Sequence, residues 1–328
     1  MNIIDILDKS SGKMNKKLEK KLYLPSPRGF CAGVERAIKI VELCSKKYDN
    51  PIFVKHEIVH NPWVINDLKN KGVTFVEELN DIPEGSKAVF SAHGVSKSTL
   101  SEAKDRNIPY IDATCPLVFK VHNEAIAHHK GGAHIFLIGH SGHPEVEGTI
   151  GQVPKGSISL IENINDVKNL EPFKYGKTAL ITQTTLSVDD TMEIVEEIKK
   201  LFPDIILPPR EDICYATTNR QGAVKSIAKK CDILYVIGAE NSSNSLRLVE
   251  VAKKAGCLQT FLISKIDEVN WQLVAESSSI GLTASASAPE ILIEEFILAL
   301  KNRYEVEVIK NEVARENISF KIPKELTG

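Results

Sequence analysis

The chain has 328 residues, of which 42% are apolar and 26% are charged, which is enough for two or three compact units with a large core. The 41 basic and 43 acidic residues nearly balance, and this argues against a nucleic-acid surface or a polybasic membrane patch. No apolar run approaches the ~18 residues of a membrane span, and the N-terminus lacks the pattern of a secretory signal.

Short β-branched runs alternate with amphipathic stretches along the chain, after a polar leader at residues 1–20 that we expect to be flexible. Candidate strands lie at 21–25, 51–54, 87–92, 133–139, 177–182, 231–238, 260–263 and 279–284. Helices are predicted between them, at 34–48, 117–130, 187–202, 218–230, 245–255 and 289–302. This alternation predicts an α/β fold with parallel sheets that are covered by helices.

Three of the six cysteines, Cys31, Cys115 and Cys214, occupy matching places, each after a strand and a loop and at the start of a helix. This spacing indicates three related α/β units. We place them at 21–114, 115–210 and 211–300, followed by a tail at 301–328 that packs back on the body. The other cysteines, Cys44, Cys231 and Cys257, are interpreted as packing residues.

Two polar loops follow each of the three cysteines, and each loop lies between a strand and a helix. The first loops hold His60, then His143 with Glu145, then Ser242, Ser243 and Asn244; the second loops hold His93, Thr184 and Ser287. Open α/β sheets bind ligands at the carboxyl ends of their strands, beside helix N-termini. If the units face a common centre, three cysteines and six polar loops converge there.

Three soft thiolates at helix N-termini suit Zn²⁺ or an iron–sulfur cluster, because the helix dipole favours the thiolate. Structural zinc sites normally use closely spaced cysteine pairs, and the sequence has none. Ligands from three separate units favour a cluster at a junction between them, and one iron of a four-iron cluster could then hold substrate. The plainer alternative is three buried, inert cysteines.

The loop residues predict an anion site, because His, Ser, Thr and Asn near helix N-termini donate hydrogen bonds to phosphate oxygens. No nucleotide-binding glycine motif is present, so a small diphosphate fits better than a nucleotide. Glu145 is either a helix cap or a proton donor whose pKa is raised beside an anion, and Thr184 could relay that proton. Local capping is the alternative for His60 and His93.

Nine ordered motifs resemble the IspH (LytB) family, the 4-hydroxy-3-methylbut-2-enyl diphosphate reductases, from about Lys21 to Leu326. They are PRGFCAGVERAI, HEIVHN, SAHGVS, DATCPLVFKVH, GHSGHPEVEGT, TQTTLSVDDT, DICYATTNRQ, NSSNS and SASAP. The resemblance implies a three-lobed α/β trefoil around a central [4Fe–4S] cluster whose ligands are Cys31, Cys115 and Cys214, with the fourth iron open to substrate.

The resemblance also implies roles for the loop residues. The diphosphate pocket carries over to His60, His93, His143, Ser242, Ser243, Asn244 and Ser287. Glu145 matches the proton-delivering acid, and Thr184 matches the hydroxyl beside it. The implied reaction is the last step of the methylerythritol phosphate route to isoprenoids. It reductively removes the substrate hydroxyl and gives isopentenyl and dimethylallyl diphosphates.

The family takes its electrons from ferredoxin or flavodoxin, and an external one-electron donor is therefore expected here. We also expect a monomer in a bacterial cytoplasm, with no nucleic-acid or membrane partner. Two other classes of function are open to the same residues. One is a non-catalytic iron–sulfur redox or ligand sensor, and the other is a zinc hydrolase with three cysteine ligands and Glu145 as general base.

Overall fold

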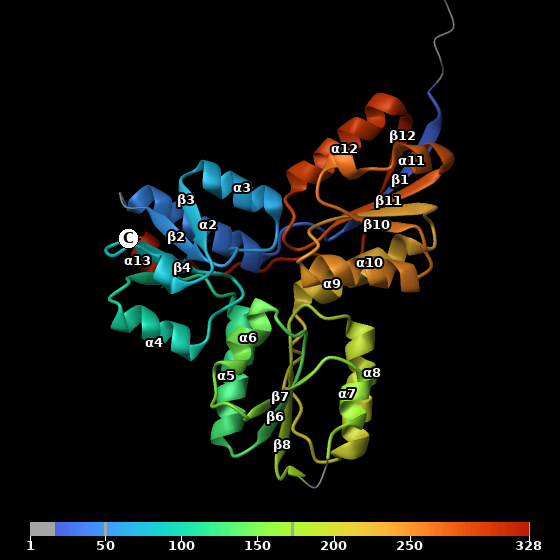
Figure 1. Cartoon of the computed structure of the whole chain (residues 1–328). Coiled ribbons are helices and arrows are strands. Elements are labelled where there is room, and N and C mark those ends of the chain that lie inside the picture. The colour runs from blue at the N-terminus through green and yellow to red at the C-terminus, as the bar shows by residue number, and fades with distance from the viewer. Residues whose placement is uncertain (1–16, 49–50, 172–173, 328) are drawn as a thin grey trace, which may run out of the picture.

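The computed structural model describes residues 17–48, 51–171 and 174–327, and in these the chain forms three lobes around a common centre (Figure 1). Each lobe is built on its own parallel sheet, as the alternation of strands and helices predicts. The predicted leader lies mostly outside the described residues, but its last two residues, Glu19 and Lys20, begin the first strand.

The first lobe is a four-stranded sheet with the order β3-β2-β4-β5. Its strands are β2 (Ile52–Lys55), β3 (Val73–Val76), β4 (Lys87–Phe90) and β5 (Tyr110–Asp112), with a 3-10 turn at Leu79–Asp81. Its helices are α2 (Ala32–Lys47), α3 (Pro62–Asn70) and α4 (Lys97–Asp105). Helices α2 and α3 share one buried cluster with β2, and α4 packs into a second cluster with Phe90.

The second lobe is a three-stranded sheet with the order β7-β6-β8. Its strands are β6 (His134–Ile138), β7 (Ile158–Ile161) and β8 (Thr178–Thr182). Its helices are α5 (Pro116–Lys130), α6 (Pro144–Ile150), α7 (Ile164–Lys168) and α8 (Val188–Leu201). Helices α5 and α6 pack in one cluster with β6 and β8, and α7 and α8 pack in another.

The third lobe is a five-stranded sheet with the order β10-β9-β11-β1-β12. Its strands are β1 (Glu19–Ser26), β9 (Ile233–Ile237), β10 (Thr260–Ile263), β11 (Ser279–Ala284) and β12 (Glu305–Glu312). Its helices are α9 (Tyr215–Ala228), α10 (Ser243–Lys254), α11 (Trp271–Glu276) and α12 (Glu290–Arg303), with a 3-10 turn at Ile266–Glu268. A short final helix, α13 (Lys324–Thr327), packs against the first lobe.

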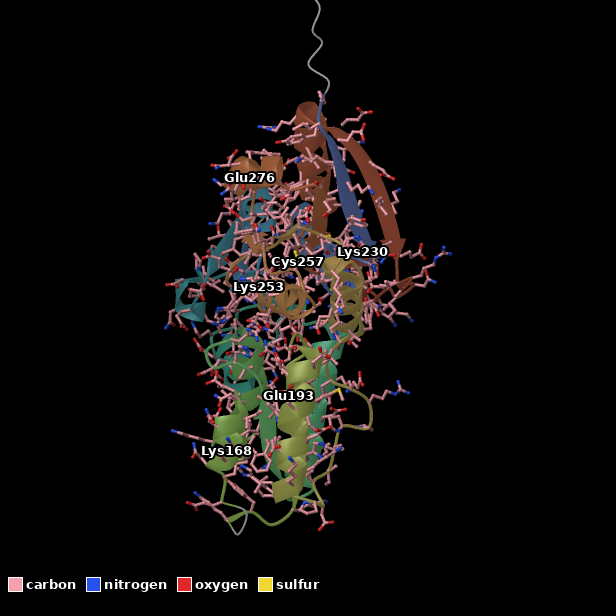
Figure 2. All side chains as sticks on the ribbon, turned by 90° about the vertical axis from the view of Figure 1, so that its right-hand side faces the viewer. Lys168, Glu193, Lys230, Lys253, Cys257 and Glu276 are labelled. Carbon is pink, nitrogen blue, oxygen red and sulfur yellow. The ribbon has the colours of Figure 1, made fainter. Side chains whose placement is uncertain are left out.

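The second and third lobes follow one another along the long axis of the molecule. Figure 2 shows Glu276, Cys257 and Lys253 of the third lobe above Glu193 and Lys168 of the second. Within the described residues, no helix is long and apolar enough to cross a bilayer.

The chain passes between the sheets at three crossings, and each crossing carries one of the predicted cysteines. From β1 of the third sheet, the chain runs through Cys31 into α2 of the first lobe. From β5 it runs through Cys115 into α5 of the second lobe. The segment that bridges to β8 at Ile206 continues through Cys214 into α9 of the third lobe. All three crossings therefore have the same form, in which a segment of one sheet leads through a cysteine into a helix of the next lobe.

The sequence-predicted strands and long helices are all present, with ends that differ by a few residues. Strands β3, β5, β7 and β12 are additional to the predicted set. The unit boundaries at 21–114, 115–210 and 211–300 stay a prediction, although β1 pairs with β11 and β12 in the sheet of the third lobe. The stretch assigned to the first unit therefore contributes its first strand to another sheet.

Candidate active site at the meeting of the three lobes

All twelve sequence-predicted site residues line one pocket at the centre of the molecule. They are Cys31, His60, His93, Cys115, His143, Glu145, Thr184, Cys214, Ser242, Ser243, Asn244 and Ser287. The same pocket is also lined by Gly33, Val34, Val59, Ala92, Leu117, Val118, Thr185, Thr217 and Ala286. The three lobes therefore do face a common centre, as the repeat predicts.

Each of the three cysteines is the N-cap of a helix and makes no side-chain capping hydrogen bond. Their backbone N–H groups repeat a second pattern, because each donates to the carbonyl of a polar loop that also lines the pocket. Cys31 donates to Ala286 (3.3 Å), Cys115 to Ala92 (3.0 Å) and Cys214 to Thr184 (3.0 Å). These bonds tie each cysteine to the second polar loop of the sheet from which the chain has just come.

The three cysteines are partly exposed to the pocket, and desolvation by the surrounding protein changes the acidity of their thiols. It raises the pKa of Cys115 to about 12 and that of Cys214 to about 11. The helix N-terminus was expected to favour the thiolate, but desolvation of the charged form outweighs it here. Without a bound metal these thiols therefore stay protonated and are poor nucleophiles.

Gly33, on helix α2, has no side chain, and this leaves room for two of the thiols. A Cβ added at Gly33 would lie 2.7 Å from the Sγ of Cys115 and 3.8 Å from the Sγ of Cys31. Among the described residues, no three His, Cys, Asp or Glu side chains are placed to hold a single metal ion. The three thiols share one pocket without being gathered at one point.

The carboxyl group of Glu145 and Thr184 form what we call the acid side of the pocket. Glu145 lies in the first turn of α6 and is 3% exposed. It accepts hydrogen bonds from the backbone N–H of Thr184 (2.6 Å) and from the Thr184 hydroxyl (3.0 Å). Burial nevertheless raises the pKa of Glu145 to about 7, so a large fraction of this group carries a proton at neutral pH.

Three imidazole rings form what we call the anion side of the pocket. The rings of His60 and His93 stack with centroids 4.2 Å apart, and His143 meets each of them edge-on at 5.5 and 5.7 Å. Burial, reinforced by the neighbouring rings, keeps the pKa of His93 well below its usual value and lowers that of His143 to about 3. His93 and His143 are therefore neutral in the protein as it stands.

All three of these histidines have a polar partner at Nδ1, which for His93 is the hydroxyl of Ser91 (3.3 Å). The Nδ1 of His143 accepts a hydrogen bond from the backbone N–H of Glu145 (3.1 Å), which caps α6 and puts the ring hydrogen on Nε2. The Nδ1 of His60 donates to the carboxylate of Glu57 (3.0 Å), and its Nε2 is buried without a hydrogen-bond partner in the described structure. Both Nε2 atoms are left available for a ligand.

The third lobe lines the pocket with hydroxyl and amide groups. Ser242 caps α10 by accepting from Ser245 N–H (3.3 Å), and Ser243 donates to the carbonyl of Thr185 (3.1 Å). The side-chain oxygen of Asn244 accepts from Ala286 N–H (2.9 Å). Ser287 donates to the carbonyl of His60 (2.9 Å) and so joins the third lobe to the first.

The chain is similar to known proteins over most of its length. A protein-family model described as LytB protein matches residues 22–301, most of the chain. The chain belongs to the LytB family. It is 53% identical over 313 residues to the 4-hydroxy-3-methylbut-2-enyl diphosphate reductase of Paracoccus denitrificans (strain Pd 1222), covering 95% of this chain and 99% of that protein.

Two further relatives are also reductases by name. The reductase of the same name from Beijerinckia indica subsp. indica is 53% identical over 314 residues, covering 95% of this chain and 98% of that protein. The solved structure of the E-1-hydroxy-2-methyl-but-2-enyl-4-diphosphate reductase from Plasmodium falciparum superposes with a TM-score of 0.89. It shares 40% identity, and the match covers 95% of this chain and 97% of that one.

The sequence of this LytB chain did not predict the two residues that contact His60, which are Glu57 and Asn241. Glu57 accepts from both His60 and Asn241, whose side-chain nitrogen lies 2.9 Å from the same carboxylate oxygen. Glu57 stands three residues before His60 within the motif HEIVHN, and that spacing is the one local signal for the pair. Asn241 comes from the third lobe, so its part could not be found without the tertiary fold.

Proposed function

We propose that this protein is a reductase that converts 4-hydroxy-3-methylbut-2-enyl diphosphate into isopentenyl and dimethylallyl diphosphates. The observation that carries the proposal is the meeting, in one pocket of a LytB-family fold, of three thiols, a buried acid and a set of anion-binding groups. Each substrate molecule takes up two electrons and two protons and loses its hydroxyl group as water.

A [4Fe–4S] cluster fits the donors that line the pocket. The three thiols come from three lobes, and their spread suits a group with several metal atoms better than one Zn²⁺ ion. Cys31, Cys115 and Cys214 would hold the cluster, and the missing side chain at Gly33 leaves room beside two of them. When bound, such a cluster supplies electrons one at a time and an iron that can act as a Lewis acid.

The anion side of the pocket would bind the diphosphate. Nε2 of His60 and Nε2 of His143 are available to phosphate oxygens, and the hydroxyls of Ser242 and Ser287 add neutral donors. An anionic oxygen at Nε2 of His60 requires a proton on that atom. The hydrogen bond from His60 keeps the pKa of Glu57 below its usual value, so an ionised carboxylate holds the His60 ring in place.

The acid side would supply a proton to the departing hydroxyl. About half of the Glu145 carboxyl groups carry a proton at neutral pH because the pKa is about 7, which is near the optimum for general acid catalysis at that pH. The Thr184 hydroxyl can donate to or accept from Glu145, so it holds the acid in place in either protonation state. Burial of both residues keeps water away from this exchange.

A reconstitution experiment tests the proposal. Protein purified without oxygen should contain iron and sulfide and should convert 4-hydroxy-3-methylbut-2-enyl diphosphate when given reduced ferredoxin or flavodoxin. Both isopentenyl and dimethylallyl diphosphates are the expected products. A fully loaded protein that binds the diphosphate but yields neither product would identify a sensor instead. Stoichiometric zinc with release of inorganic diphosphate would identify a hydrolase.

A further inference from the structure

The C-terminal segment at 313–323, which we call the strap, crosses from the third lobe to the first without regular secondary structure. It leaves β12 with the N–H of Val313 donating to the carbonyl of Ser26 (2.9 Å). It ends at α13, where Leu326 is buried in the core of the first lobe. Figure 1 shows α13 beside the first lobe and β12 in the third lobe.

Arg220, on α9, is fully buried and binds backbone beside two of the three cysteines. Its guanidinium donates to the carbonyl of Gly29 (2.9 and 2.7 Å) and to that of Phe30 (3.1 Å), which immediately precede Cys31. It also donates to the carbonyl of Ala216 (3.0 Å), two residues after Cys214. One side chain therefore fixes the backbone at two of the crossings.

A buried guanidinium needs a negative partner, because an unpaired charge in the interior is costly. The strap supplies it, as both carboxylate oxygens of Glu316 accept from Arg220 at 3.0–3.3 Å. Asn219, beside Arg220 on α9, also donates to Glu316 (3.0 Å). The Glu316 side chain is 15% exposed, so solvent screens this pair only weakly.

Arg36, on α2, repeats the arrangement at the third cysteine. Its guanidinium donates to the carbonyls of Ala113 (3.2 Å) and Thr114 (3.1 Å), which immediately precede Cys115. Its Nε donates to the carbonyl of Lys321 on the strap (2.9 Å). Two arginines thus hold the backbone beside all three cysteines, and the strap contacts both of them.

We propose that the strap positions the three cysteines through Arg220 and Arg36, with Glu316 as the residue that fixes Arg220. This inference rests on the proposed function, because it assigns a role toward the group that the cysteines hold. Glu316, Arg220 and Arg36 are positioning residues, since none of them lines the pocket.

The ion pair of Arg220 and Glu316 also affects the electrostatic potential at Cys31. At Cys31 the positive charge of Arg220 and the negative charge of Glu316 oppose one another. Neutralising Glu316 would leave the Arg220 charge uncompensated. A cluster gains negative charge on reduction, so an uncompensated positive charge nearby favours the reduced form and moves its potential to more positive values.

The test compares Glu316→Gln with Glu312→Gln in the anaerobic, cluster-loaded protein. Glu312 is a matched control, because it ends β12 and makes an exposed ion pair with Arg315. We expect Glu316→Gln to lose iron to a ferrous chelator about tenfold faster, within the range for loss of an outer partner of a metal site. Its reduction potential should shift to more positive values, while Glu312→Gln should match the unmodified protein.

The conservative variant Glu316→Asp separates the effect of the Glu316 charge from the effect of its hydrogen bonds to Arg220. Glu316→Asp keeps the negative charge, so it should restore the potential even if iron loss stays fast. The proposal is overturned if Glu316→Gln matches Glu312→Gln in both iron loss and potential. A purely structural role is indicated, and positioning through charge is refuted, if iron loss rises with no shift in potential.

A measurement without metal keeps the strap testable if the proposed function fails. In protein stripped of metal, we expect alkylation of Cys31, followed by mass spectrometry, to be faster in Glu316→Gln than in Glu312→Gln, because Arg220 then holds the backbone before Cys31 less firmly. Equal alkylation rates would contradict the strap proposal. Absence of iron from the unmodified protein would instead refute the proposed function, and the alkylation result would still decide the role of the strap.

Discussion

The acid side and the anion side of the pocket treat charge in opposite ways. Glu145 is fully hydrogen-bonded by Thr184, yet burial raises its pKa to about 7, so it holds a proton before any ligand arrives. His93 and His143 are partly buried, but desolvation lowers their pKa values and leaves them neutral. The same desolvation that stores a proton on a carboxyl group withholds one from an imidazole.

This difference assigns the two sides different steps. The acid side lies within the second lobe, and we propose that it delivers the proton. The anion side is shared between two lobes, with His60 and His93 from the first and His143 from the second. Variants on the acid side should therefore change turnover, and variants on the anion side should change binding.

The largest expected effect is that of Glu145→Gln. The amide keeps the size of the side chain and a hydrogen bond to Thr184, but it cannot deliver a proton. We expect turnover to fall by about 10²–10⁴-fold while iron content and diphosphate binding stay unchanged. Glu147→Gln is the matched control, because Glu147 lies two residues further along α6 and is exposed. An equal loss in both variants would remove the special role of Glu145.

Glu57→Gln should have an intermediate effect on the other side of the pocket. The variant keeps the shape of the side chain but removes the charge that supports His60. We expect binding of the diphosphate to weaken about tenfold, equal to about 1.4 kcal/mol, with little change in single-turnover rate at saturation. The same substitution at Glu77, which pairs with His56 at an exposed site, is the control. A change in rate alone would contradict the division between the two sides.

The last expected effect is on stability in acid and not on activity. The pKa of His143 is lowered to about 3, so between about pH 6.5 and pH 3 the unfolded chain binds a proton there that the folded chain does not. Stability at this site is therefore present above pH 6.5 and is lost as the pH falls, by up to about 1.4 kcal/mol per pH unit.

His143→Asn should relieve that loss, because asparagine can still cap α6 but does not titrate. Urea unfolding at several pH values between 7 and 5 measures the effect. The unmodified protein should lose stability more steeply than the variant as the pH falls. Parallel curves would show that His143 is not held neutral by the fold.

Local sequence predicts the pocket better than it predicts what supports the pocket. Cys31, Cys115 and Cys214 could be placed because a residue between a strand and a helix is visible in a single stretch of sequence. The polar loops could be placed for the same reason. Their residue types predicted a metal or cluster site and an anion site, and the resemblance to the LytB family then implied the particular substrate and the role of each residue.

The supporting contacts join segments that are far apart in the chain. Arg220 and Glu316 are 96 residues apart, and their pairing depends on the path of the strap. Residues 305–312 were placed in the tail at 301–328, and their pairing with β1 makes them strand β12 of the third sheet. Glu57 was missed because a carboxylate in a polar loop is usually solvated, and its contact with Asn241 spans two lobes.

The central claim is that Glu145 holds a proton in the empty pocket. Infrared difference spectra between the unmodified protein and Glu145→Gln, recorded between pH 5 and pH 9, test it most directly. The account predicts the carbonyl band of a protonated carboxyl group at pH 5, which disappears with a midpoint near pH 7. A carboxylate band that is already complete at pH 5 would contradict it.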